Sequence, residues 1–318
     1  MVMVEQHERS RALQPWLLAR DGSVLDGQDH DRRLVELGAG LSRHPGVRAA
    51  EPRVSAERLQ RTLTALHEPD YVNAIARVAG EEPALMSQFA APGMAPDTPV
   101  CESVAVAAFE GVRTAIAAAD RVLAGERFAY AMCRPPGHHA GPSWLGGCCY
   151  FNNAAAAAHV LREGGLRPVA IIDLDIHYPN GTAAIVARSS DTTLCSLHSW
   201  PVVNVAAQTA HPPGERELLF EFREPPAADR YLEAVEQAIA RLASSAQAIV
   251  LSLGYDTVAG DPHGSWSFEP AIFLAIGERL AASALPVCIV QEGGYALGTL
   301  AQCAFAFAEG LLGQEETR

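Results

Sequence analysis

The stretch VAIIDLDIHYPNGT, residues 169–182, begins as a continuous apolar run and ends in polar residues. An apolar run without alternation is typical of a parallel strand that is covered on both faces. Asp173, Asp175 and His177 follow with one apolar residue between each, so a period of two places them on one face. Because ligands bind beyond the carboxyl ends of the strands in an open parallel sheet, this stretch predicts a site there.

Outward from this stretch, apolar runs alternate with helix-length segments. The other apolar runs, each bounded by Gly, Pro or polar residues, are 128–133, 193–198, 248–254 and 287–294. The helix-length segments, which are rich in Ala, are 102–123, 152–164, 229–244, 270–283 and 297–312. Strands that alternate with helices at this spacing predict an α/β fold, in which helices cover both faces of a parallel sheet.

Residues 1–100 are less regular, and we expect them to wrap the sheet with helices and loops. We expect long loops at 83–99 and 199–217, and such loops on an α/β scaffold often form the rim of a site. No internal repeat, low-complexity tract or linker divides the sequence. We therefore expect a single domain over residues 1–318.

The composition excludes several classes of partner. The 37 acidic and 24 basic residues give a net charge of −13, which repels nucleic acid and attracts a cationic amine or a basic peptide. No apolar stretch is long enough for a membrane span, and no signal peptide begins the sequence. The seven cysteines form no CxxC pair, which indicates free thiols in a reducing compartment. We expect a cytoplasmic protein without nucleic-acid or membrane partners.

Three of the other apolar runs also end in polar residues. These residues are His138 and His139, then Asp256, and finally Glu292 and Tyr295. The carboxyl ends of parallel strands meet at one edge of a sheet, so we expect all of these side chains to converge.

The converging residues include a candidate metal centre. Two carboxylates packed beside an imidazole would repel each other or stay unpaired unless a cation neutralised them. Asp175, His177 and Asp256 would supply three ligands and leave one position open, as catalytic zinc sites do. Zinc is therefore the favoured metal, and Fe²⁺ or Co²⁺ is also compatible with this oxygen-rich set.

Each of these signals also has a purely structural explanation. A D-x-D-x-H sequence alone is more often a salt-bridged strand end, and paired histidines are often structural donors. Asp256 alone would fit a helix cap, and Tyr295 alone would fit a turn. Their joint occurrence at successive strand ends favours a site. The histidines that no spacing ties to the metal set, and that we assign to structure, are His67, His198, His211 and His263.

A set of ordered motifs extends beyond these residues. They are RPPGHHA, GGCCYFNNAAAAA, DLDIHYPNGT, SLH, LSLGYDTVAGDP and QEGGY, with a weaker match at LHEPDYV. In this order they resemble the histone deacetylase/acetylpolyamine amidohydrolase superfamily over roughly residues 95–312. QEGGY and LSLGYDT lean toward its bacterial branch of histone deacetylase-like and acetylpolyamine amidohydrolases. The resemblance implies an arginase/deacetylase-like fold, with one eight-stranded parallel sheet flanked by helices.

Matched motif by motif, the resemblance implies a metal centre that faces an imidazole pair. Asp175, His177 and Asp256 would hold a zinc ion. His139 would act first as the general base and then as the general acid, with His138 as its electrostatic partner. Tyr295 would donate a hydrogen bond to the substrate carbonyl, and the two glycines before it suggest a loop that can swing the ring inward.

The resemblance also implies a supporting set. Asp173 would orient His138, Asn180 would orient His139, and Arg33 would match an arginine beneath the active site. A structural K⁺ or Na⁺ ion would bind Asp173, Ser196 and backbone carbonyls near Asp175, His177 and Leu197.

The rim of the site and two departures bear on specificity. Asp97 would grip the substrate backbone. Cys148 stands where relatives usually have Phe or Tyr, which predicts a wider tunnel, and Trp200 is a candidate for the opposite wall. Tyr178 and Pro179 replace the usual His and Gly after a metal ligand, which predicts an altered turn with the ligands retained.

These expectations together describe a zinc-dependent amidohydrolase that removes an acetyl or short acyl group from an aliphatic primary amine. The substrate would be an acetylpolyamine or an acetyl-lysine peptide. Alternatives are a deacylase of a secondary-metabolite intermediate, a non-catalytic binding protein that retains the fold, and an arginase-like dinuclear hydrolase. The stretch between Tyr71 and Asp97 is shorter than the insertion that supports dimers in acetylpolyamine amidohydrolases, so a homodimer stays open.

Overall fold

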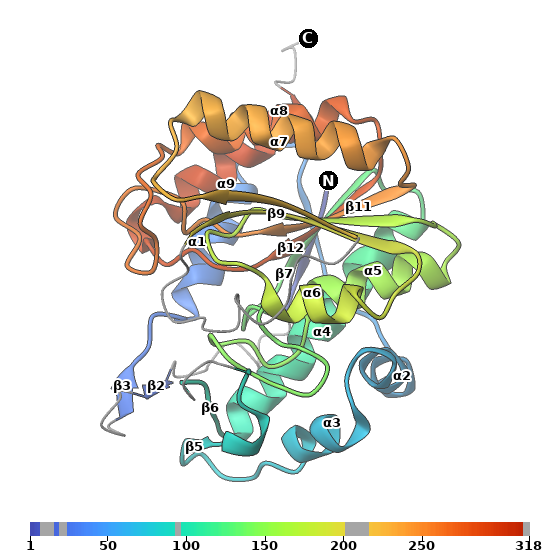
Figure 1. The fold of residues 1–318 in the computed structure, drawn as a ribbon, viewed down its shortest axis with the longest axis vertical. Helices are drawn as coiled ribbons and strands as arrows, with labels where there is room; N and C mark the ends of the chain where they lie inside the picture. The colour runs from blue at the N-terminus through green and yellow to red at the C-terminus, as the bar shows by residue number, and fades with distance from the viewer. Residues whose placement is uncertain (7–15, 19–23, 93–96, 201–215, 314–318) are drawn as a thin grey trace.

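A parallel sheet of eight strands forms the centre of the molecule in the computed structural model (Figure 1). The structure describes residues 1–6, 16–18, 24–92, 97–200 and 216–313. Across the sheet the strand order is β10-β9-β8-β11-β12-β7-β1-β4, and every neighbouring pair is parallel. The strands are β1 (Val2–Glu5), β4 (Arg48–Ala50), β7 (Phe128–Met132), β8 (Val169–Asp173), β9 (Thr192–Ser199), β10 (Glu217–Phe222), β11 (Ala248–Leu253) and β12 (Val287–Gln291).

Helices cover both faces of this sheet (Figure 1). One face carries α1 (Arg32–Leu41), α7 (Ala228–Ala243), α8 (Ala271–Ala282) and α9 (Leu297–Leu312). The other face carries α2 (Ala56–Leu66), α3 (Pro69–Ala76), α4 (Glu102–Leu123), α5 (Asn153–Glu163) and α6 (Asn180–Val186). Successive residues of one strand feed the two cores, as Ile171 and Ile172 of β8 do. Continuous apolar runs are therefore needed in the central strands.

Two features of the sequence place α4 and α5 against the sheet. In α4 the buried side chains are mostly alanines, which let the helix approach the strands closely. At the start of α5 the Asn152 side chain accepts a hydrogen bond of 2.8 Å from the backbone N–H of Ala155. This N-cap satisfies one of the free donors of the first turn and fixes where the helix begins.

The predicted α/β architecture is confirmed. The prediction that residues 1–100 only wrap the sheet needs a correction. All five apolar runs are strands, and all five Ala-rich segments are helices. However, β1 and β4 come from residues 1–100 and complete one side of the sheet, so this segment does more than wrap it. Both strands are short, and β4 is largely exposed.

The two predicted loops contain some regular structure. Within 83–99 lie the short strand β5 (Ala84–Leu85), one 3₁₀ turn and the start of β6 (Pro99–Val100), and β5 pairs with β6. In the second loop, β10 begins at residue 217, and residues 201–215 lie outside the described part of the chain. A second antiparallel pair joins β2 (Trp16–Leu18) to β3 (Val24–Asp26). Across the described ranges, no helix combines the length and the hydropathy that a membrane crossing requires. The single-domain boundary of 1–318 stays a prediction.

Candidate metal and catalytic site

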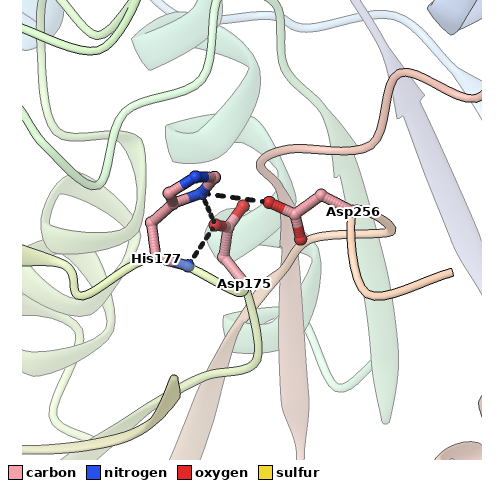
Figure 2. A group of neighbouring side chains, drawn as sticks. All are labelled: Asp175, His177 and Asp256. Atoms are coloured by element: carbon pink, nitrogen blue, oxygen red, sulfur yellow. Dashed lines mark hydrogen bonds and ion pairs between the residues drawn. The ribbon is translucent and has the colours of Figure 1, made fainter. Parts of the chain in front are cut away.

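Asp175, His177 and Asp256 meet where β8 and β11 end, and Figure 2 shows the imidazole turned toward both carboxylates. One ligand atom from each residue lies within 4.8 Å of the other two. His177 Nδ1 is 2.9 Å from Asp175 Oδ1 and 3.2 Å from Asp256 Oδ2. Strand β8 ends at Asp173, so Asp175 and His177 lie in the following loop and not on the predicted strand face. The three side chains converge all the same.

The charges of this cluster call for a cation. Asp175 and Asp256 are 1% and 0% exposed, and buried Oδ2 of Asp256 has no hydrogen-bond partner. Burial and the neighbouring Asp175 carboxylate raise the pKa of Asp256. Burial also acts to raise the pKa of Asp175, but the His138 and His177 imidazoles hold it well below its ordinary value. A buried oxygen that accepts no hydrogen bond, beside a second carboxylate and an imidazole, fits a divalent ion.

Glycine backbone forms the walls around these carboxylates. A Cβ on Gly254 or on Gly293 would lie 2.5 Å from Asp175 Oδ2, and one on Gly264 would lie 1.8 Å from the carbonyl oxygen of Asp256. The N–H of Gly293 also donates a 2.9 Å hydrogen bond to Asp175 Oδ2. The absence of side chains at these positions lets the main chain press against the ligands.

The loop after β7 brings the imidazole pair to the same edge. The His138 and His139 ring centroids are 4.1 Å apart, and the His139 and His177 centroids are 5.9 Å apart. His138 Nδ1 lies 3.3 Å from Asp173 Oδ2, and His139 Nδ1 lies 2.7 Å from Asn180 Oδ1. The two expected orienting partners, Asp173 and Asn180, are therefore in contact with the expected rings.

The two imidazoles have opposite electrostatic surroundings. Burial acts to lower the pKa of His138, but the Asp175 and Asp173 carboxylates raise it to about 10. Burial lowers the pKa of His139 well below its ordinary value, and the neighbouring His138 lowers it further. The pair thus consists of one ring held protonated and one ring held neutral.

Tyr295 follows β12 and is held from several directions. Its ring lies under the Arg33 guanidinium, with the Cζ atom 4.3 Å from the ring centroid, and the His263 ring packs edge-on at 4.7 Å. Asp261 Oδ2 accepts hydrogen bonds from the N–H of Tyr295 at 2.6 Å and of Ala296 at 3.1 Å. Burial raises the pKa of Tyr295 well above its ordinary value, although Arg33 opposes this, so the hydroxyl keeps its proton.

The glycines before Tyr295 have a structural role besides the loop motion expected from the sequence. Gly294 has a φ of +112°, and a Cβ there would lie 2.6 Å from the Tyr255 Cβ. Its carbonyl oxygen accepts a 2.6 Å hydrogen bond from Arg33 Nε. Close approach therefore requires Gly294, and Arg33 lies beneath the site as expected.

The rim residues form one supported turn. Asp97 Oδ1 accepts from the N–H of Gly147 at 3.2 Å and from the Thr98 hydroxyl at 2.7 Å. The N–H of Cys148 donates to the same hydroxyl at 3.0 Å. A Cβ on Gly147 would lie 2.5 Å from His139 Cδ2, so this turn touches the imidazole pair and Cys148 lies next to that contact. Asp97 accepts hydrogen bonds within this turn, and its contact with the substrate backbone stays a prediction.

The residues predicted to bind a monovalent cation lie together next to the candidate metal site. Asp173 and Ser196 are cross-strand partners of β8 and β9, and Leu197 follows Ser196; all three are completely buried. Ser196 Oγ is 2.9 Å from His198 Nδ1, and Asp173 Oδ1 accepts from the N–H of Asp175 at 3.1 Å. The ion itself stays a prediction.

The departure at Tyr178 ties the metal-ligand loop to an edge strand. Its hydroxyl donates a 3.0 Å hydrogen bond to Glu217 Oε2 on β10, and its ring lies 5.1 Å from that of His198. Pro179 is the N-cap of α6. His177 keeps its contacts to Asp175 and Asp256, and an altered shape of the turn stays a prediction.

The remaining residues singled out from the sequence lie away from the metal cluster or outside the described residues. His67 contacts the Gly141 carbonyl oxygen through Nδ1 at 2.8 Å, and burial lowers its pKa to about 4, as expected of a structural histidine. His211 lies outside the described residues. The N–H of Trp200 donates to the Phe222 carbonyl at 2.8 Å, and its place in the tunnel wall stays a prediction.

Two buried carboxylates had no chemical role in the sequence prediction, although Glu292 was among the residues expected to converge. Asp261 holds the backbone of Tyr295, and Glu292 accepts from the N–H groups of Gly137 and His138. Both residues stand in motifs that the sequence displays, GDP and QEGGY. Their motifs could have drawn attention to them, but their backbone partners could not be read from the sequence.

Comparison with known proteins finds one family over most of the chain. The family model of the histone deacetylase domain matches residues 29–311. Acetylpolyamine amidohydrolase 1 of Pseudomonas aeruginosa is 34% identical over 222 residues, which cover 67% of this chain and 64% of the relative. The acetylpolyamine amidohydrolase of Mycoplana ramosa is 35% identical over 217 residues, which cover 63% and 61%. The chain thus matches less than two thirds of the length of either relative.

A solved structure extends the comparison to nearly the whole chain. The crystal structure of acetylpolyamine aminohydrolase from Burkholderia pseudomallei superposes with a TM-score of 0.85 at 28% identity and covers 98% of each chain. The arginase/deacetylase-like fold expected from the motifs is confirmed.

Proposed function

The chain belongs to the histone deacetylase family, and from this premise we propose that it is a zinc-dependent amidohydrolase that removes an acetyl or short acyl group from an aliphatic primary amine. The observation that carries the proposal is the cluster of Asp175, His177 and Asp256 beside a neutral His139. A divalent ion held by these three residues would supply a Lewis acid for the amide carbonyl and for the attacking water.

His139 is suited to proton transfer by its hydrogen bond to Asn180. A side-chain amide oxygen only accepts, so Nδ1 of His139 carries the proton and donates it to Asn180 Oδ1. The other ring nitrogen is then free to take a proton from the attacking water and to give it to the leaving amine. Burial and the neighbouring His138 both lower the pKa of His139, so its neutral form is favoured until that transfer.

Tyr295 would serve the developing oxyanion. Its hydroxyl keeps its proton and can donate it in a hydrogen bond to the carbonyl oxygen as negative charge accumulates there. Arg33 and His263 pack against the ring and limit its movement.

The substrate proposed is a cationic acylated amine. The net charge of −13 attracts an acetylpolyamine or a basic acyl-lysine peptide, and it disfavours nucleic acid. Cys148, with its small side chain beside the imidazole pair, also leaves room for a bulkier acylated intermediate. A K⁺ or Na⁺ ion at Asp173, Ser196 and the backbone near Asp175, His177 and Leu197 and a cytoplasmic location are parts of this proposal, and the oligomeric state stays open.

The test combines metal analysis with turnover. We expect the zinc-loaded protein to hold about one zinc in this site and to hydrolyse members of a panel of N-acetylated polyamines and acetyl-lysine peptides. Tyr295→Phe keeps the ring and removes the hydroxyl, so it should bind the same zinc and lower kcat by about 10²-fold or more.

Three results would count against the proposal. A fully zinc-loaded protein that hydrolyses no acylated amine in the panel would favour a binding protein of this fold. A metal content near two ions, apart from K⁺ or Na⁺, would favour an arginase-like dinuclear centre. An unchanged kcat in Tyr295→Phe would remove the hydroxyl from the mechanism.

A further inference from the structure

Glu292 is a completely buried carboxylate that the proposed mechanism does not use. It follows β12, and its Oε2 accepts hydrogen bonds from the N–H of Gly137 at 2.7 Å and of His138 at 3.2 Å. Its Oε1 accepts from the Ser252 hydroxyl of β11 at 2.8 Å. Burying a carboxylate costs free energy unless hydrogen-bond donors satisfy its oxygens. These three contacts therefore explain how Glu292 can be accommodated in the core.

The peptide that Glu292 holds leads directly into the imidazole pair. The carbonyl oxygen of His138 accepts from the N–H of Thr182 at 3.1 Å, so the backbone of His138 is held at both its donor and its acceptor. Gly137 has no spare room, because a Cβ there would lie 2.5 Å from the backbone nitrogen of Asn153. His139 is the next residue, and its ring position depends on this backbone.

The hold does not depend on the charge of Glu292. Burial raises the pKa of Glu292 to about 7, although the neighbouring His138 opposes the shift. Both backbone N–H groups point to the same oxygen, Oε2. If the other oxygen is protonated, Oε2 still accepts both hydrogen bonds, and the Ser252 hydroxyl can accept from the new O–H group.

We propose that Glu292 is a positioning residue: by fixing the Gly137–His138 backbone through hydrogen bonds, it sets the place of the His139 ring relative to the metal cluster. This inference rests on the proposed function for its effect on catalysis. Glu292 touches no reacting atom, and it acts through the backbone that carries the imidazoles.

Two conservative variants separate reach from charge. Glu292→Gln removes the charge but can keep all three contacts, because its amide oxygen can accept from both N–H groups and its NH₂ group can donate to Ser252. Glu292→Asp keeps the carboxylate on a side chain one methylene shorter, which cannot reach both elements. Ser252→Ala is the matched control, since it removes only the contact that does not involve the imidazole loop.

We expect kcat to separate these variants. Glu292→Asp should lose about 10²-fold in kcat with KM within about twofold, since a displacement of about 1 Å at a reacting group has an effect of this size. Glu292→Gln and Ser252→Ala should stay within about threefold of the wild type. Thermal unfolding and zinc content, measured on the same samples, normalise each kcat to folded and loaded sites.

A second readout is independent of turnover. The ¹⁵N chemical shifts of the His138 and His139 rings in the metal-free protein should move in Glu292→Asp and stay in place in Glu292→Gln. An unchanged kcat per loaded site in Glu292→Asp, or an equal loss in both variants, overturns the positioning role. If the wild type hydrolyses no acylated amine, the proposed function fails, and the ring shifts alone then decide whether Glu292 positions the pair.

Discussion

Ionisable side chains are buried at the central strands of the sheet and exposed to solvent at its two edges. β7, β8, β11 and β12 are buried along their whole length, and the carboxylates and the imidazole pair beyond their ends are buried with them, whereas His177 and Tyr295 are partly exposed. At the edges, β10 is half-buried and β4 is largely exposed. Arg48 of β4 pairs with Glu126 while 61% and 31% of their side chains remain exposed.

The difference shows that enclosure, and not residue type, shifts the pKa values of the carboxylates at the centre. Asp256 and Glu126 carry the same functional group. One has its pKa raised by burial and a neighbouring carboxylate, and the other forms a solvated ion pair. Charges near water are screened and contribute little, whereas buried charges interact strongly and need a partner. Substitutions from the centre to the edge should therefore have steadily smaller effects.

The largest effect is expected at Asp256. Asp256→Asn should lower metal affinity by more than the 10–100-fold that an outer partner of a metal ligand typically contributes, and turnover should fall with it. The same change replaces a buried carboxyl, whose negative charge is unfavourable beside Asp175, by a neutral amide, so the metal-free variant should unfold at the same or a higher temperature than the metal-free wild type. Metal titration and calorimetry on both forms would check this; a metal-free variant that is much less stable would contradict the role of enclosure.

An intermediate effect is expected at Tyr178, which joins the centre to the edge. Tyr178→Phe removes the hydrogen bond to Glu217, which should lower the free energy of unfolding by about 1–2 kcal/mol and change turnover only several-fold. Denaturant unfolding and kinetics would measure both effects, with Glu217→Gln as the control. A loss of turnover as large as that of Asp256→Asn would mean that the edge strand contributes directly to the site. It would contradict the expected decrease in effect from the centre to the edge.

The smallest effect is expected at the surface pair of Arg188 and Glu68. These side chains lie 2.9 Å apart and are 60% and 53% exposed. Arg188→Ala should change the free energy of unfolding by less than about 1 kcal/mol, and by less still in high salt. Urea unfolding at two salt concentrations tests this; a large change that salt does not reduce would be inconsistent with screening.

The same contrast explains which strands the sequence predicts. The central strands carry continuous apolar runs because helices cover both of their faces, and this pattern is visible without a structure. β4 is only Arg48–Ala50, and its sequence has no strand pattern of its own. It pairs with β1 in the sheet, and that pairing depends on tertiary contacts that periodicity does not report.

The residues of the site also divide into those that the sequence predicts and those that it does not. Asp175, His177 and Asp256 could be predicted because strand ends meet at one edge and their chemistry favours a cation. The roles of Asp261 and Glu292 could not, because each acts on backbone N–H groups far away in the chain. Tyr295 is 34 residues from Asp261, and Gly137 is 155 residues from Glu292. Main-chain donors are present at nearly every residue, so a sequence does not single out which of them a carboxylate will meet.

The glycine walls around Asp175 have a consequence for how this site could be altered. Gly254 and Gly293 approach the same carboxylate oxygen, and neither has a side chain to contribute. A survey of tolerated substitutions would nonetheless rank them beside the ligands, since even alanine would displace the main chain that encloses the carboxylate. Engineering of new selectivity therefore has to begin at the rim residues, because the glycine walls around Asp175 leave no room for a side chain.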